Sequence, residues 1–126
     1  MNYFNQSLAS IHKQLVNKDI SVEELTKQTL DNIKIVDGDI NAFLTLDEEG
    51  ALKQANKLDE KGIDSDNLLS GMPVAVKDNI VTKGLKTTAA SKILENFTPI
   101  YDATAAEKIK NLGTITVGKT NMDEFA

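Results

Sequence analysis

The sequence predicts an α/β fold, in which N-terminal amphipathic helices are followed by the beginning of a parallel or mixed sheet. Apolar residues recur at helical spacing through the first half of the chain. Short β-branched or apolar runs at residues 74–76 and 114–117 flank a helical segment in the second half. A strand, a crossover helix and a strand form a βαβ unit with parallel strands. We therefore expect one domain, with a helical region at 1–62 and the start of an α/β core at 71–126.

The first helix is expected over residues 7–17. Leu8, Ile11 and Leu15 are three and four residues apart, so they form one apolar stripe. His12 is the single histidine of the chain and is predicted to lie on the surface.

The second helix is expected to begin at Ser21 and to run to about residue 35. Ser21 and Glu24 have the spacing of a capping box, in which each side chain bonds the backbone amide of the other residue. The pair Asp37 and Gly38 is typical of a stop and turn.

The rest of the chain divides into shorter elements. A short strand is possible at 42–44, and a third helix at 47–61 should end at Gly62, which suits a C-cap. Residues 74–76 are compatible with a fully buried strand, and a helical turn is expected at 90–94. Asp102 is predicted to cap a helix that ends at residue 111.

Composition narrows the classes of function. The 126 residues carry a net charge of −5 with scattered lysines, which argues against a nucleic-acid-binding surface. There is no cysteine and one histidine, so we expect no disulfide, no thiolate metal site and no histidine-rich metal site. No cofactor is expected in this chain. No signal-peptide pattern or membrane-length apolar run is present, so a cytoplasmic location is expected.

Lys77 is the main candidate for a catalytic group. It follows the 74–76 strand directly, and an open parallel sheet places its reactive groups at the carboxyl ends of strands. A lysine in a buried cleft can lose its proton and act as a base, although most strand-end lysines are solvated. Asp78 is either a partner of Lys77 or an acid without a catalytic part. Residues 87–91 supply hydroxyl groups, for which a helix N-cap is the favoured role.

The motif Gly71-x-Pro73-x-x-x-Lys77-Asp78 resembles the lysine motif of the amidase signature family. Further similarity lies at residues 77–80, 87–97, 99–104 and 118–126, and it is strongest from Gly71 onward. General amidases often have glycine where this chain has Ala90. The resemblance is closest to the glutamine-hydrolysing subunits of tRNA-dependent amidotransferases.

This resemblance implies an enzyme with a Ser–cis-Ser–Lys triad in which Lys77 is the catalytic lysine. Both serines of the family lie downstream of the Asn121–Ala126 motif, so we expect the sequence to be part of a longer polypeptide. Residues 1–126 alone should not hydrolyse glutamine.

The same resemblance implies a translation complex. Glutamine would be the substrate, and its ammonia would pass to a partner protein, the B subunit, which activates Glu-tRNA(Gln) with ATP and Mg²⁺. The C subunit would hold the other two together, and tRNA(Gln) would be bound only through the B subunit. The alternatives are a stand-alone amidase of the same family and a non-catalytic module that docks a partner through its N-terminal helices.

Overall fold

The structure is a computed structural model that describes residues 3–124. Its helices are η1 (Tyr3–Asn5), α1 (Leu8–Val16), α2 (Val22–Ile40), α3 (Glu48–Lys61), η2 (Lys92–Leu94) and α4 (Thr104–Asn111). Its strands are β1 (Phe43–Leu46), β2 (Pro73–Lys77) and β3 (Ile115–Thr120). In the part of the chain described, no helix is long and apolar enough to cross a membrane.

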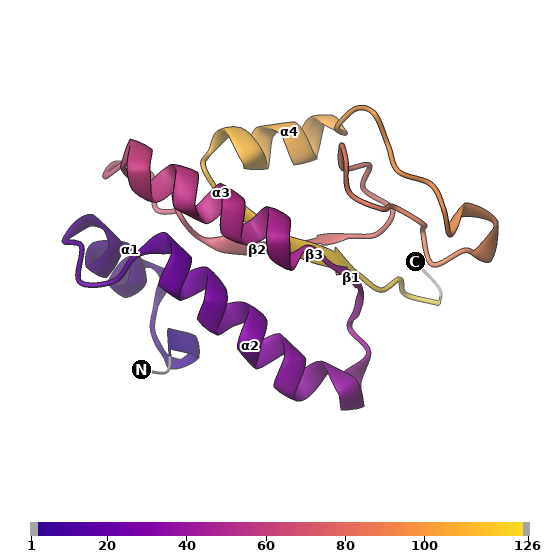
Figure 1. Cartoon of the computed structure of the whole chain (residues 1–126), viewed down its shortest axis with the longest axis horizontal. Coiled ribbons are helices and arrows are strands. Elements are labelled where there is room, and N and C mark those ends of the chain that lie inside the picture. The colour runs from indigo at the N-terminus through magenta and orange to yellow at the C-terminus, as the bar shows by residue number, and fades with distance from the viewer. Residues whose placement is uncertain (1–2, 125–126) are drawn as a thin grey trace.

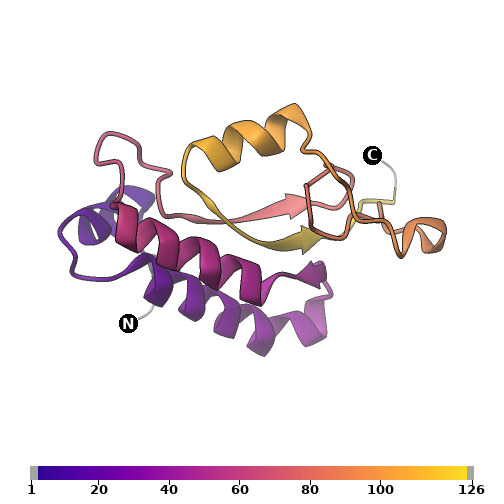
Figure 2. The same ribbon diagram turned by 45° about the horizontal axis from the view of Figure 1, so that its top comes forward.

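Strand β3 lies at the centre of the sheet, whose order is β1-β3-β2. It runs parallel to β2 and antiparallel to β1. The expected βαβ unit is therefore confirmed, and β1 makes the sheet mixed. Figure 2 shows α4 on one side of the sheet and the α2–α3 pair on the other. Helices α2 and α3 lie side by side (Figure 1).

The core lies between the N-terminal helices and β3. Its central members, all 0–3% exposed, come from α1, α2, α3, the segment before β2, and β3: Leu15, Val22, Leu25, Leu30, Ala51, Ala55, Met72, Ile115 and Val117. Strand β2 is less buried than expected. Val76 is buried, but Ala75 is exposed, because β2 forms one edge of the described sheet.

The capping box expected at the start of the second helix is confirmed, and α1 also begins at a capping serine. Ser7 accepts a hydrogen bond from the amide of Ser10, and the capping box between Ser21 and Glu24 is complete. The predicted end of the second helix is wrong, because α2 continues through Gly38 to Ile40. Its end is set instead by Asn41, which adopts a left-handed conformation at φ 56°.

The prediction that His12 lies on the surface is also wrong. The imidazole is 5% exposed, and its Nε2 lies 3.1 Å from the carbonyl oxygen of Asp64. The buried face of α1 consists of Ile11, His12 and Leu15, whereas Leu8 of the expected stripe is 54% exposed. The loop after α3 contacts this face through Asp64.

Asp102 does not cap α4. The N-cap position is Ala103, which makes no side-chain capping bond. The carboxylate of Asp102 instead accepts a bond from the amide of Lys83 at 2.7 Å and bonds from the ammonium of Lys110 at 2.7 and 2.9 Å. Burial raises the pKa of Asp102. The bonds from Lys110 and Lys83 together lower the pKa by more than burial raises it, so the pKa lies below its ordinary value.

Two glycines allow close approaches between elements. At Gly71, φ is +82°, and a Cβ atom would lie 3.1 Å from Val22 and 3.2 Å from Leu15, so the glycine fits beneath the helices. At Gly118, a Cβ atom would collide with the carbonyl oxygen of Thr45 in β1.

Replacement of Gly118 by alanine should therefore separate β1 from β3. We expect a loss of about 1–3 kcal/mol in the free energy of unfolding, measured by urea denaturation. Gly38→Ala is the matched control. Gly38 lies inside α2 with no neighbour within 4 Å of its Cβ position, so this change should stabilise the chain by up to about 1 kcal/mol. Equal effects of the two changes would contradict the close packing of β1 on Gly118.

Asp102→Asn should destabilise the chain by about 1 kcal/mol at neutral pH, because it removes a charged acceptor from Lys83 and Lys110. Since the folded-state pKa of Asp102 is lowered, its contribution is fully present above the unfolded value of about 3.9 and is lost as the pH falls through the folded-state pKa. Unfolding curves of both proteins measured across acidic pH should therefore converge. A constant difference down to the lowest pH would refute this assignment.

Candidate active site

Lys77 is the last residue of β2 and is paired with Thr120 at the end of β3, as its place in the sequence predicts. Its side chain is 39% exposed, and its ammonium group forms an ion pair with the carboxylate of Asp123. The hydrogen bond from Lys77 holds the pKa of Asp123 below its ordinary value. Residues 3–124 therefore place Lys77 at the carboxyl edge of the sheet without burying it.

Asp78 turns to a different partner. Its side chain is buried, and Oδ2 accepts bonds from the amide and hydroxyl of Thr88 at 3.0 and 2.5 Å and from the amide of Ala90 at 3.4 Å. Its backbone oxygen accepts from the amide of Ala89 at 3.0 Å. Of the two roles considered for Asp78, partner of Lys77 or acid elsewhere, the structure shows an anchor for the loop at 88–90.

This anchored loop contains two strained residues. Ala89 and Ala90 have φ values of 49° and 55°, a left-handed conformation that costs a non-glycine residue about 1–2 kcal/mol. The bonds to Asp78 offset this cost and fix the direction of the loop. Strained backbone held by its surroundings is common at functional sites.

The buried lysine of this region is Lys119 in β3, which the sequence pattern did not single out as a site residue. It is 0% exposed, and its Nζ donates to the carbonyl oxygen of Ile80 at 2.6 Å and to the hydroxyls of Thr87 and Thr82 at 2.9 and 3.0 Å. Burial lowers the pKa of Lys119, although the carboxylate of Asp78 acts in the opposite direction.

A sequence signal for Lys119 does exist. Lys119 closely follows the β-branched run at 114–117 that predicts a strand, and a lysine in a buried strand requires acceptors. Simple alternation does not predict its environment, because the pairing of β2 with β3 shifts register between Val74 and Ala75.

The expected role of residues 87–91 as a helix N-cap is not observed. Ser91 occupies the N-cap position of η2 but makes no side-chain capping bond. The Thr87 and Thr88 hydroxyls instead bond the charged groups of Lys119 and Asp78.

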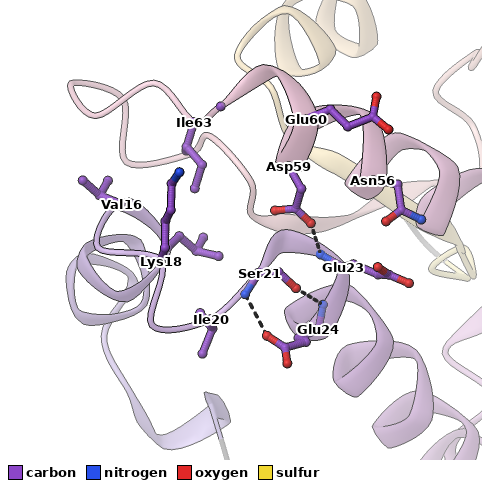
Figure 3. A pocket seen from close by; sticks show the side chains of 12 residues that line it. Val16, Lys18, Ile20, Ser21, Glu23, Glu24, Asn56, Asp59, Glu60 and Ile63 are labelled. Carbon is purple, nitrogen blue, oxygen red and sulfur yellow. Dashed lines mark hydrogen bonds between the residues drawn. The ribbon is translucent and has the colours of Figure 1, made fainter.

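A hollow of about 920 Å³ lies away from this region, between the start of α2 and the end of α3 (Figure 3). Asp59 of α3 caps α2 there, accepting from the amides of Val22 and Glu23 at 2.8 and 2.9 Å. The capping box of Ser21 and Glu24 lines the same hollow. These polar groups serve the helix ends, and no cluster of potential metal ligands occurs within residues 3–124.

The chain is similar to known proteins in both sequence and fold. A family model described as Amidase matches residues 24–126. The chain belongs to the amidase family. The A subunits of the glutamyl-tRNA(Gln) amidotransferases of Ligilactobacillus salivarius and Oenococcus oeni are 64% identical over 126 residues and 62% identical over 125 residues. These alignments cover 100% and 99% of this chain and 26% of each relative, so the chain spans about a quarter of their length.

Solved structures of amidases share the fold. The native peptide amidase from Stenotrophomonas maltophilia superposes with a TM-score of 0.88 at 28% identity over 98% of this chain and 26% of that protein. The A subunit of the Thermotoga maritima glutamyl-tRNA(Gln) amidotransferase gives 0.75 at 34% identity over 100% of this chain and 25% of that protein. The expected incomplete amidase fold is confirmed.

The two lysines should differ in chemical reactivity. In the folded chain, an amine-acetylating reagent at mildly alkaline pH should modify Lys77 rapidly and Lys119 very slowly, because the latter is reached only by local opening. Peptide mass spectrometry measures both sites in one sample. Both should react at similar rates in urea, and equal rates in the folded chain would contradict the burial of Lys119.

Proposed function

We propose that this chain is the N-terminal part of the A subunit of a glutamyl-tRNA(Gln) amidotransferase and supplies Lys77 as the base for glutamine hydrolysis. The observation that carries the proposal is the sequence identity of 62–64%, over 99–100% of this chain, to proteins of that name. The position of Lys77 at the carboxyl end of β2 supports its role, since ligands of open α/β sheets bind at that edge.

In this mechanism a serine attacks the side-chain amide of glutamine, and Lys77 accepts the serine's proton through a second, bridging serine. Serine is a weak nucleophile until a base takes its proton. The proton then passes to the leaving ammonia, and water releases glutamate from the acyl-enzyme. Both serines would come from residues downstream of Ala126 in a longer polypeptide.

Lys77 must be neutral to act as this base. A free lysine has a pKa of about 10.4, so action near neutral pH requires a decrease of about three units, or about 4 kcal/mol. Within the described residues Lys77 remains partly exposed and paired with Asp123. The mechanism therefore requires further chain to cover Lys77 and to take it from Asp123.

The ammonia would be used by partner proteins. The B subunit would activate Glu-tRNA(Gln) with ATP and Mg²⁺, and the C subunit would hold the complex together. A stand-alone amidase is the second candidate, favoured by the close superposition on the peptide amidase. The two differ in substrate, because an amidotransferase should prefer free glutamine and transfer its ammonia to the B subunit.

A full-length chimera tests the proposal. It joins residues 1–126 of this chain to the remainder of the Ligilactobacillus salivarius A subunit, which is 64% identical over the replaced segment. The chimera, purified with the B and C subunits of that organism, should release ammonia from glutamine and form Gln-tRNA(Gln). Hydrolysis of peptide amides in preference to glutamine would instead favour the stand-alone amidase.

In this chimera Lys77→Ala should lower kcat for glutamine hydrolysis by at least about 100-fold, because general-base catalysis contributes roughly 10²- to 10⁴-fold. Lys108→Ala is the control, since Lys108 is a lysine of α4 outside the carboxyl edge of the sheet, and it should keep the parental rate. Circular dichroism should show that both variants remain folded. Near-parental turnover of Lys77→Ala would remove Lys77 from the mechanism.

A further inference from the structure

A series of hydrogen bonds joins Lys119 to the backbone of Lys77. The Lys119 ammonium donates to the carbonyl oxygen of Ile80 at 2.6 Å, and the amide of Ile80 donates to the carbonyl oxygen of Lys77 at 2.9 Å. The amide of Asp78 donates to the carbonyl oxygen of Thr120 at 2.9 Å. The backbone at Lys77 is therefore held by two contacts: the pairing of Asp78 with Thr120 of β3, and the bonds that lead through Ile80 to Lys119.

The bonding of Lys119 shows that it is not itself a base. Its ammonium has three hydrogens, and each has an acceptor in the loop after β2. The Thr82 and Thr87 hydroxyls donate to the carbonyl oxygens of Ile80 and Leu85, which leaves their oxygens free to accept from the ammonium. With no exposed surface, Lys119 has no path to a substrate.

Asp78, the residue that follows β2, is a second buried charged group beside Lys119. It is as fully buried as Lys119, and its Oδ1 makes no hydrogen bond within the described residues. A buried carboxylate requires a nearby opposite charge, and Lys119 is close enough to interact with it electrostatically. Asp78 holds residues 88–90, whereas Lys119 holds residues 80–87.

We propose that Lys119 is a positioning residue, whose buried ammonium clamps loop 78–90 onto β3 and thereby fixes the place of Lys77 at the active edge of the sheet. The activity part of this inference rests on the proposed glutaminase function. The clamp itself rests only on the contacts of β2, β3 and the loop.

The test uses the full-length chimera with Lys119→Met, which keeps an unbranched apolar side chain as far as Cε and removes the ammonium. We expect kcat for glutamine to fall about 10- to 100-fold with KM nearly unchanged, because misplacement of a catalytic group slows the chemical step. Hydrogen exchange at the amides of residues 79–90 should accelerate, while β3 and the N-terminal helices stay protected. Thr82→Val and Thr87→Val each remove one acceptor, so they should give smaller changes in the same direction.

Leu30→Ala is the control for loss of stability. Leu30 is 1% exposed and belongs to the helical core, outside loop 78–90, so this variant should lower Tm without changing kcat per folded molecule or exchange in the loop. The proposal fails if Lys119→Met keeps the parental kcat, or if Leu30→Ala produces the same loss of kcat.

Two further outcomes are also decisive. If Lys119→Met does not fold, the threonine variants decide, and parental kcat and loop exchange in both would overturn the proposal. If the parent chimera does not hydrolyse glutamine, the proposed function fails by itself. Exchange in the loop then decides the clamp alone: selective acceleration in Lys119→Met supports it, and unchanged protection overturns it.

Discussion

The burial of β3 is the constraint on which the other elements depend. This strand is paired on both edges, and its residues from Ile115 to Lys119 are all buried. Because β3 lies between two strands and against the helices, each of its residues must fit the group that it contacts. Ile115 and Val117 supply the apolar contacts with the helices, Gly118 admits β1, and Lys119 requires a shell of oxygen atoms. The helices pack against Ile115 and Val117, and the loop after β2 supplies the acceptors of Lys119.

The two lysines near the carboxyl edge of the sheet show how burial separates structural and chemical roles. The physical argument from the sequence assigns a dry environment to Lys77, whereas in residues 3–124 the dry lysine is Lys119. A lysine whose hydrogens are all bonded to fixed acceptors stabilises the fold but is a poor base. Lys77, on the open carboxyl edge of the sheet, keeps its freedom to meet a substrate.

Local signals predicted much of the fold. The capping box at Ser21 and the C-cap at Gly62 set helix ends through bonds between near neighbours in sequence, so pattern alone located them. The errors have other causes. The burial of His12 and the partners of Asp102 depend on contacts with residues that are distant in sequence. The end of α2 was missed for a local reason, because the left-handed cap is formed by Asn41 and not by the glycine of the Asp37–Gly38 pair. In the site, the position of Lys77 was predictable from its strand. The bonds of Asp78 to Thr88 and of Lys119 to Thr87 were not, because they join residues whose contact no sequence pattern indicates.

The contact between Asp59 and the start of α2 has a mechanical consequence. Because a carboxylate of α3 satisfies two amides of α2, neither helix can slide along the other by a turn of about 5.4 Å without leaving those amides unbonded. The helix pair is thereby locked in register as a stiff support behind the sheet. Because α2 and α3 both contact β3 on the face of the sheet opposite α4 (Figure 2), a shift of β3 toward the helices would have to disturb both members of the pair.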